Sequence, residues 1–267
     1  MTLLDRMKSI SPTCILCGGQ NPTETTDHIP PKSIFFLKQR PRGLEFPACR
    51  ACNQGSKLDD QVVGWFSRIY PDPEADAETK ELNKLTKSVQ RNVPGLLAEL
   101  QATDSQLVTF RKGVPAQYAD KHVLSADGPI LNEIVGCFGA KMGIALHFEK
   151  TGRVVPVEGR AAVKWYTNYQ AITGDIPTDA LSLLGAPETL QMGKWEVSDQ
   201  FQYSSAWLED GRLSLHYATF RRSFAILVAV FASNADLIEG LVENSAGVFQ
   251  PGWLIDRQPK FKRLKMW

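Results

Sequence analysis

The chain has 267 residues, of which 43% are hydrophobic and 22% are charged, and its net charge is +1. These values are typical of a folded, water-soluble protein and exclude a strongly basic chain that attracts nucleic acid through its overall charge. Any bound nucleic acid must therefore be attracted by a local basic patch. The length fits one large domain, or a small domain joined to a larger one.

The first residues, MTLLDRMKSISPTC, lack the long apolar core of a secretory signal. Two stretches, 130–148 and 224–232, are more apolar, but we expect neither to span a membrane. The first contains Glu133, Lys141 and His147, and the second is too short. We therefore expect a cytoplasmic protein without membrane partners, in which thiols stay reduced.

Four of the five cysteines form two C-x-x-C pairs, Cys14 with Cys17 and Cys49 with Cys52. Each pair can present two thiolates, and two pairs complete a tetrahedral zinc site. Four unrelated buried cysteines are the alternative, but two such pairs so close in sequence favour structural Zn²⁺. A redox role would need a thioredoxin-like context, which the flanking sequence does not predict. Metal can replace the missing hydrophobic core of such a small module.

The segment between the two pairs contains Asp27 and His28, followed by Ile-Pro-Pro, and Asn53 follows the last cysteine of the pairs directly. Asp-His before Ile-Pro can be a simple turn, and asparagine commonly caps a helix. A helix is predicted over 59–70. Its first residues, Asp59 and Asp60, can simply complement the helix dipole.

Four short pieces nevertheless occur in a recognisable order: C-x-x-C, Asp-His-Ile-Pro-Pro-Lys-Ser, Pro-Ala-Cys-Arg-Ala-Cys-Asn and Asp-Asp. Together they resemble the HNH (ββα-metal, His-Me finger) endonucleases, within them the zinc-bearing branch typified by phage endonuclease VII. The resemblance covers about residues 12–62 and implies a β-hairpin followed by a helix. The chain departs from the longer HNH signature, because neither Asn nor His lies between His28 and Cys49.

Transferred to this sequence, the resemblance implies that Asp27 and Asn53 bind a catalytic Mg²⁺ or Mn²⁺ and that His28 is the general base. We interpret Asp60 as a further metal ligand or as a carboxylate that supports the metal site. The chemistry agrees, because Mg²⁺ prefers oxygen ligands and a neutral histidine can accept a proton from water. The implied function is a metal-dependent endonuclease that hydrolyses phosphodiester bonds, with DNA as the expected partner.

Two other functions stay open. The N-terminal module can be a non-catalytic zinc module that binds nucleic acid or a partner protein. Alternatively, the nuclease can stay silent until the rest of the chain binds a ligand or partner. Nucleases of this kind often act as effectors in bacterial anti-phage defence, with the second domain as sensor.

The rest of the chain predicts a larger α+β domain with an antiparallel sheet. We expect an exposed helix over 74–89, a strand over 106–110 and an apolar helix over 130–150. A hairpin over 201–217 and a strand over 224–231 would complete a meander. The predicted organisation is a zinc-binding HNH domain at 1–70, a helical linker at 71–100 and an α+β domain at 101–267. We expect this last domain to select the target, sense a trigger or form a homo-oligomer.

Several other side chains are candidates for binding. Basic residues that can contact phosphates lie in the N-terminal module and in the tail: Lys32, Lys38, Arg40, Arg42, Arg50, Lys57 and residues 257–265. The aromatic residues of the second domain are predicted to form core rather than to stack on bases. His122, His147 and His216 have no partners at metal-ligand spacing.

Overall fold

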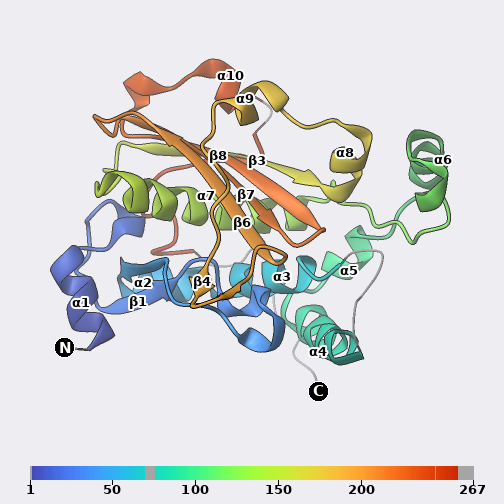
Figure 1. The fold of residues 1–267 in the computed structure, drawn as a ribbon, viewed down its shortest axis with the longest axis horizontal. Coiled ribbons are helices and arrows are strands. Elements are labelled where there is room, and N and C mark those ends of the chain that lie inside the picture. The colour runs from blue at the N-terminus through green and yellow to red at the C-terminus, as the bar shows by residue number, and fades with distance from the viewer. Residues whose placement is uncertain (1, 70–75, 244, 258–267) are drawn as a thin grey trace.

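The computed structural model describes residues 2–69, 76–243 and 245–257. Residues 70–75, where the predicted linker begins, and the basic tail beyond Arg257 lie outside them. The protein mixes helices with antiparallel sheets, as predicted (Figure 1). The largest sheet has five strands in the order β6-β7-β8-β3-β9.

The N-terminal region is built on a short hairpin followed by two helices. Its elements are α1 (Leu3–Ile10), η1 (Ile15–Cys17), β1 (Thr25–His28), η2 (Lys32–Ile34), η3 (Phe36–Lys38), β2 (Glu45–Ala48), α2 (Arg50–Gly55) and α3 (Lys57–Phe66). β1 pairs antiparallel with β2, so that Asp27 lies opposite Phe46 and His28 opposite Glu45. The order strand, strand, helix is the order that the sequence predicts.

The long connection between β1 and β2 is organised around the buried side chain of Arg40. Its guanidinium donates hydrogen bonds to backbone carbonyl oxygens on both sides of the loop, including those of Pro30 (2.8 Å) and Gly43 (2.7 Å). The side chain is only 1% exposed and also pairs with Glu45 at 3.5 Å. Arg40 therefore stabilises the loop, and its guanidinium is not available to a phosphate at the surface.

The middle of the chain is helical. Its elements are α4 (Asp76–Asn92), α5 (Leu96–Glu99), α6 (Asp104–Gly113) and η4 (Ala116–Tyr118). The predicted polar helix corresponds to α4, but the predicted strand at 106–110 is wrong. Thr103 and Gln106 form a capping box that starts α6 instead. Five residues of weak apolar alternation are a poorer signal than this local pair of hydrogen bonds.

The apolar helix predicted over 130–150 is confirmed as α7 (Pro129–Thr151), and Gly152 ends it in the left-handed conformation. Two of its glycines allow the helix to approach the sheet closely. A Cβ atom would lie 2.5 Å from Val163 at Gly139 and 2.3 Å from Val228 at Gly143. By length and composition α7 could cross a membrane, but 78% of its apolar window is buried inside the protein. This burial is that of a core helix.

The C-terminal region forms the large sheet and its cover. Its elements are β3 (Arg160–Thr167), α8 (Asn168–Thr173), α9 (Thr178–Ser182), β4 (Gln191–Met192), β5 (Trp195–Glu196), β6 (Phe201–Trp207), β7 (Leu213–Phe220), β8 (Phe224–Phe231), η5 (Asn234–Asp236), α10 (Glu239–Val242) and β9 (Gly247–Phe249). The meander β6-β7-β8 is confirmed. The strand β3, which pairs with both β8 and β9, was not predicted.

α7 lies between the sheet and the N-terminal region (Figure 1). It contacts β3 and β8 on one side and η1 and α3 on the other. One hydrophobic cluster runs through these contacts, from Cys14 to Leu254, and so continues across the predicted linker at 71–100. The N-terminal region and the large sheet therefore share one hydrophobic core.

Candidate functional site

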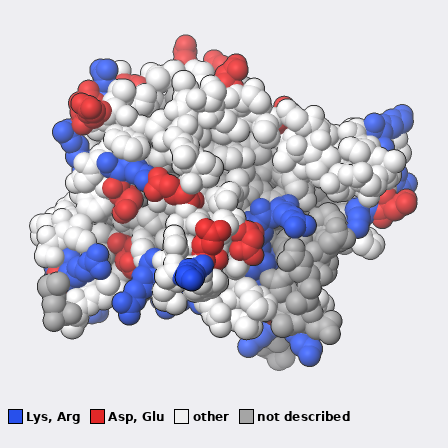
Figure 2. Space-filling model, viewed as in Figure 1, with Lys and Arg blue, Asp and Glu red and all other residues white. Residues whose placement is uncertain are grey.

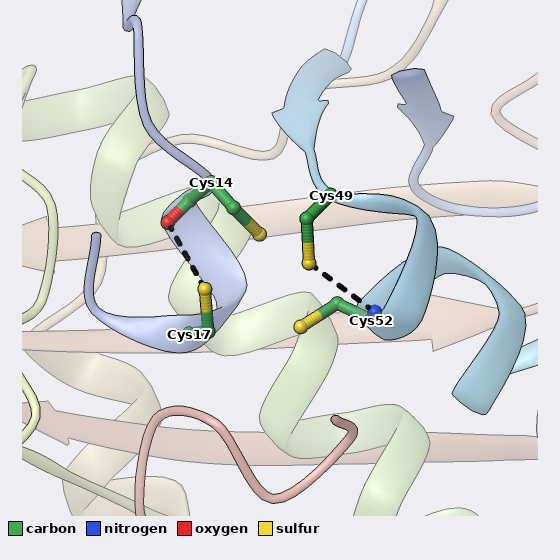
Figure 3. A group of neighbouring side chains, drawn as sticks. All are labelled: Cys14, Cys17, Cys49 and Cys52. Atoms are coloured by element: carbon green, nitrogen blue, oxygen red, sulfur yellow. Dashed lines mark hydrogen bonds between the residues drawn. The ribbon is translucent and has the colours of Figure 1, made fainter. Parts of the chain in front are cut away.

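Four cysteines form a compact, buried cluster (Figure 3). Their sulfur atoms all lie within 4.8 Å of one another, and none of the four residues is more than 1% exposed. Cys14 and Cys17 flank the turn η1, whereas Cys49 and Cys52 flank the first turn of α2. Two short turns thus direct four sulfurs to one centre, as the C-x-x-C spacing predicts. Four cysteines so arranged could hold a metal ion, consistent with structural zinc.

The surroundings of the sulfurs lower the pKa of Cys17 but raise the pKa values of Cys14 and Cys52. The backbone N–H of Cys52 lies 3.4 Å from Cys49 Sγ, and Asn21 Nδ2 lies 3.6 Å from the same atom. Hydrogen bonds from the neighbouring thiols Cys14 and Cys52 lower the pKa of Cys17, while Cys17 and burial raise the pKa of Cys14. Thiolates this close repel one another, so a bound cation is needed for all four to ionise together.

A buried lysine lies between two of the predicted site residues. Lys141, on α7, is fully buried, and its Nζ lies 3.0 Å from Asp27 Oδ2 on β1. The same nitrogen lies 2.9 Å from Asp60 Oδ2 on α3 and 2.9 Å from Ser56 Oγ. The ammonium group thus has three partner residues in the N-terminal region, on β1, on α3 and at the junction of α2 with α3. Asp27 and Asp60 are brought together, and they meet through this lysine.

These contacts set the charges at the centre of the site. Burial raises the pKa of Asp60 to about 6, although Lys141 opposes the shift. Burial alone would lower the pKa of Lys141, but Asp27 and Asp60 outweigh it and raise the pKa. At neutral pH Asp60 is therefore mostly ionised and Lys141 is protonated. A lone lysine in an apolar helix signals such a partnership, because a buried charge requires one.

Asp59, next to Asp60, also pairs with a basic side chain from the C-terminal region. It is 1% exposed, and its Oδ2 accepts a hydrogen bond from the guanidinium of Arg257. Arg257 also lies 3.7 Å from Glu133 on α7. Asp59 therefore fixes the C-terminal segment to α3. Arg257, the first residue of the predicted basic tail, is paired with an acid within the protein.

Asn53 connects α2 to β1. Its Nδ2 donates to Thr26 O at 3.3 Å and to Thr25 Oγ1 at 3.4 Å, so the amide lies beside the strand that leads to Asp27. With the nitrogen occupied, Oδ1 of Asn53 accepts no hydrogen bond from the described residues. The same holds for Oδ1 of Asp27. Two oxygen atoms of the kind that Mg²⁺ prefers are thus left for another ligand, and this donor set fits a hard divalent ion.

His28 is the last residue of β1 and is half-buried. Burial lowers its pKa below 6.5, and the positive charges of Arg40 and Lys32 lower it further. The imidazole is therefore neutral at pH 7, which is the form that accepts a proton. Among the described residues no hydrogen bond engages its ring nitrogens.

The remaining histidine candidates are structural. His147 and His216 are each 1% exposed and share the hydroxyl of Ser214, at 2.8 Å from a ring nitrogen of each. His216 also lies 2.9 Å from Ser205 Oγ. Ser214 lies beside both histidines, but all three residues are buried, so a substrate does not reach them. His122 is exposed and lies in a groove lined by α6 and the end of β3.

This buried pair predicts a loss of stability in acid. Burial lowers the pKa of His147 to about 4 and of His216 to about 3. The unfolded chain then binds more protons than the folded one below pH 6.5, so stability falls as the pH falls toward 3. Each histidine contributes about 1.4 kcal/mol per pH unit in this window. We expect His147→Gln to flatten the slope by that amount in urea titrations from pH 7 to 4, and His122→Ala to leave it unchanged. Equal slopes for wild type and His147→Gln would contradict the assignment.

The aromatic residues are mostly in the core, as predicted. Trp165 packs edge-on against Phe66 at 6.0 Å and donates a hydrogen bond to Asn132 at 2.8 Å. Trp253 packs against Phe249. Trp207, which is 47% exposed, is the exception among these.

Five of the six predicted basic residues of the N-terminal region are exposed: Lys32, Lys38, Arg42, Arg50 and Lys57. On the face drawn in Figure 2, basic side chains are interleaved with acidic ones over the lower part of the molecule. The basic residues therefore act over short distances rather than through a broad field of one sign.

The described residues thus define a mixed helix-and-sheet protein with a four-cysteine centre and a pair of carboxylates that contact one buried lysine. Comparison with protein-family models, with curated proteins and with solved structures finds no match to this chain.

Proposed function

We propose that the protein is a metal-dependent endonuclease of the HNH type that hydrolyses phosphodiester bonds in DNA. One observation carries the proposal. The strand bearing Asp27 and His28 is bound by the Asn53 amide, and α2, which carries Asn53, also carries Cys52 of the four-cysteine centre. A carboxylate, an amide oxygen and a neutral imidazole are the groups that such a reaction requires.

The residues divide the chemistry among them. His28 accepts a proton from a water molecule, whose oxygen forms the new bond to phosphorus as the bond to the leaving oxygen breaks. Oδ1 of Asp27 and Oδ1 of Asn53 would hold Mg²⁺ or Mn²⁺, which when bound supplies positive charge at the phosphate and the leaving oxygen. The four-cysteine centre takes no part in the chemistry and keeps the hairpin against α2.

The exposed basic residues around the hairpin support a polyanionic substrate. Lys32 follows the strand that carries His28, and Arg50 begins the helix that carries Asn53. Each phosphate contact releases counterions, so binding should weaken steeply with salt. Contacts of these side chains with the DNA phosphates carry no sequence information. We therefore expect the protein to bind many DNA sequences.

The test is cleavage of supercoiled plasmid by pure zinc-containing protein in Mg²⁺ or Mn²⁺, with EDTA as the negative condition. We expect nicked and linear products from wild type and a loss of about 10²-fold or more for Asp27→Asn, because the variant removes a charged ligand. Asp179→Asn, an exposed acid on α9, is the matched control and should cleave like wild type. Equal cleavage by wild type and Asp27→Asn would sink the proposal.

A second candidate is a zinc module that binds nucleic acid or a protein without cutting. The ammonium of Lys141 favours it, because it already neutralises Asp27 without a divalent ion. This candidate predicts salt-dependent DNA binding that EDTA does not weaken, and no cleavage with either metal. Gel-shift titrations beside the plasmid assay distinguish the two functions.

A further inference from the structure

Both carboxylates of the candidate site contact one buried ammonium group. Asp27, from β1, and Asp60, from α3, each lie about 3 Å from Lys141 Nζ, and Asp60 offers both of its oxygens, at 2.9 and 3.2 Å. Two carboxylates and a hydroxyl thus converge on one point. Oxygen atoms arranged in this way are also suited to bind a divalent cation.

Lys141 comes from the opposite side of the interface. It lies on α7, and its long side chain passes from the core of the C-terminal region into the N-terminal region. Its Nζ donates hydrogen bonds to Ser56 and to both oxygens of Asp60, and it forms an ion pair with Asp27 at 3.0 Å. An ammonium group that is fully buried and fully paired is held firmly, because losing any partner leaves a charge unpaired.

We propose that Lys141 is a positioning residue that occupies the place of a cation between Asp27 and Asp60. In this role it fixes the carboxylate of Asp27 by Oδ2, so that Oδ1 is presented to the divalent ion. It also keeps Asp60 out of the ligand set. This inference rests on the proposed nuclease function only for the identity of the ion at Asp27. The place of the ammonium follows from its own contacts.

The same geometry explains the acidic pair on α3. Asp59 is bound by Arg257 and Asp60 by Lys141, so each acid receives one cation from the C-terminal region. Both acids are therefore anchors of the interface. The alternative, in which Asp60 is a ligand of the divalent ion, requires the ammonium to leave its pocket.

The experiment measures Mn²⁺ binding by electron paramagnetic resonance on zinc-loaded protein, without DNA. In the wild-type background we expect Asp27→Asn to weaken Mn²⁺ binding at least about tenfold and Asp60→Asn to change it by less than about threefold. The reason is that, of these two acids, only Asp27 is proposed to bind the ion. An equal loss in both variants would overturn the proposal.

The second arm removes the ammonium. Lys141→Met keeps an unbranched side chain, one atom shorter, but leaves the two carboxylates facing each other without the ammonium, so we expect Mn²⁺ to bind at least about tenfold more tightly than in wild type. Adding Asp60→Asn to this variant should abolish the gain. Unchanged binding in a folded Lys141→Met protein would overturn the proposal. If this variant does not fold, the comparison of Asp27→Asn with Asp60→Asn still decides.

The outcomes separate this inference from the proposed function. A wild-type protein that binds no Mn²⁺ and cuts no DNA contradicts the nuclease. A gain of Mn²⁺ binding in Lys141→Met that depends on Asp60 would still support the place of the ammonium. Conversely, a nuclease whose Mn²⁺ requirement depends equally on Asp27 and Asp60 would keep the function and refute the role of Lys141.

Discussion

Cys52→Ser is expected to release the bound metal and to unfold the N-terminal region. The hairpin strands have only four residues each, and the second C-x-x-C pair connects β2 to α2. Structural zinc contributes apparent binding free energies of about 10–16 kcal/mol in small modules, which is comparable to the whole stability of a domain. We expect wild-type protein to contain one zinc per chain and the variant to contain almost none.

Because α7 packs on both η1 and the large sheet, this loss should extend beyond the module. We expect a large decrease in melting temperature, measured by circular dichroism, together with increased proteolysis of residues before α4. The matched control is Cys137→Ser, which changes another buried thiol that lies on α7 outside the cluster. It should keep its zinc. A Cys52→Ser protein that is zinc-free but melts like wild type would refute the structural role of the metal.

His28→Ala is expected to reduce the rate of DNA cleavage by about 10²–10⁴-fold, the usual contribution of a general base. The fold should survive, because among the described residues the imidazole makes no hydrogen bond that the variant would break. His122→Ala removes an exposed histidine and should cleave like wild type. The measurement is the single-turnover rate of plasmid nicking at saturating Mg²⁺, with melting temperatures to verify folding.

The pH dependence gives a second measurement on the same proteins. A general base works in its neutral form, so the wild-type rate should rise with pH through the pKa of His28 and then level off. Burial and the nearby charges of Arg40 and Lys32 place that pKa below 6.5, so the plateau should be reached by neutral pH. In His28→Ala the rise should disappear. A wild-type rate that keeps rising above pH 7.5 would assign the proton transfer to another group.

The placement of Lys141 and Arg257 bears on how the two regions depend on each other. Residues proposed to act on DNA lie before α3, but Lys141, which pairs with Asp27 and Asp60, comes from α7, and Arg257, which pairs with Asp59, comes from the C-terminal region. A ligand or partner that moved α7 would therefore move the ammonium group of Lys141 away from Asp27. This coupling gives a physical route for the silent-effector alternative, which needs a second region that controls the first.

Much of the protein was predictable from local patterns. The C-x-x-C spacing by itself determines that two pairs of sulfurs project from tight turns, and the structure brings all four together. The apolar pattern over 130–150 predicted α7, and the hairpin over 201–217 with the strand over 224–231 predicted the meander. These features are visible in the sequence because each depends on residues a few positions apart.

Only the tertiary structure decided what surrounds Asp27. Its partner Lys141 is more than 100 positions away, and neither residue carries a local signal for the other. The strand β3 and the helix α6 were missed for related reasons: β3 is defined by its neighbours β8 and β9, and α6 by a cap that outweighs weak alternation. Periodicity and spacing report local geometry, whereas the pairing of buried charges depends on how distant elements pack.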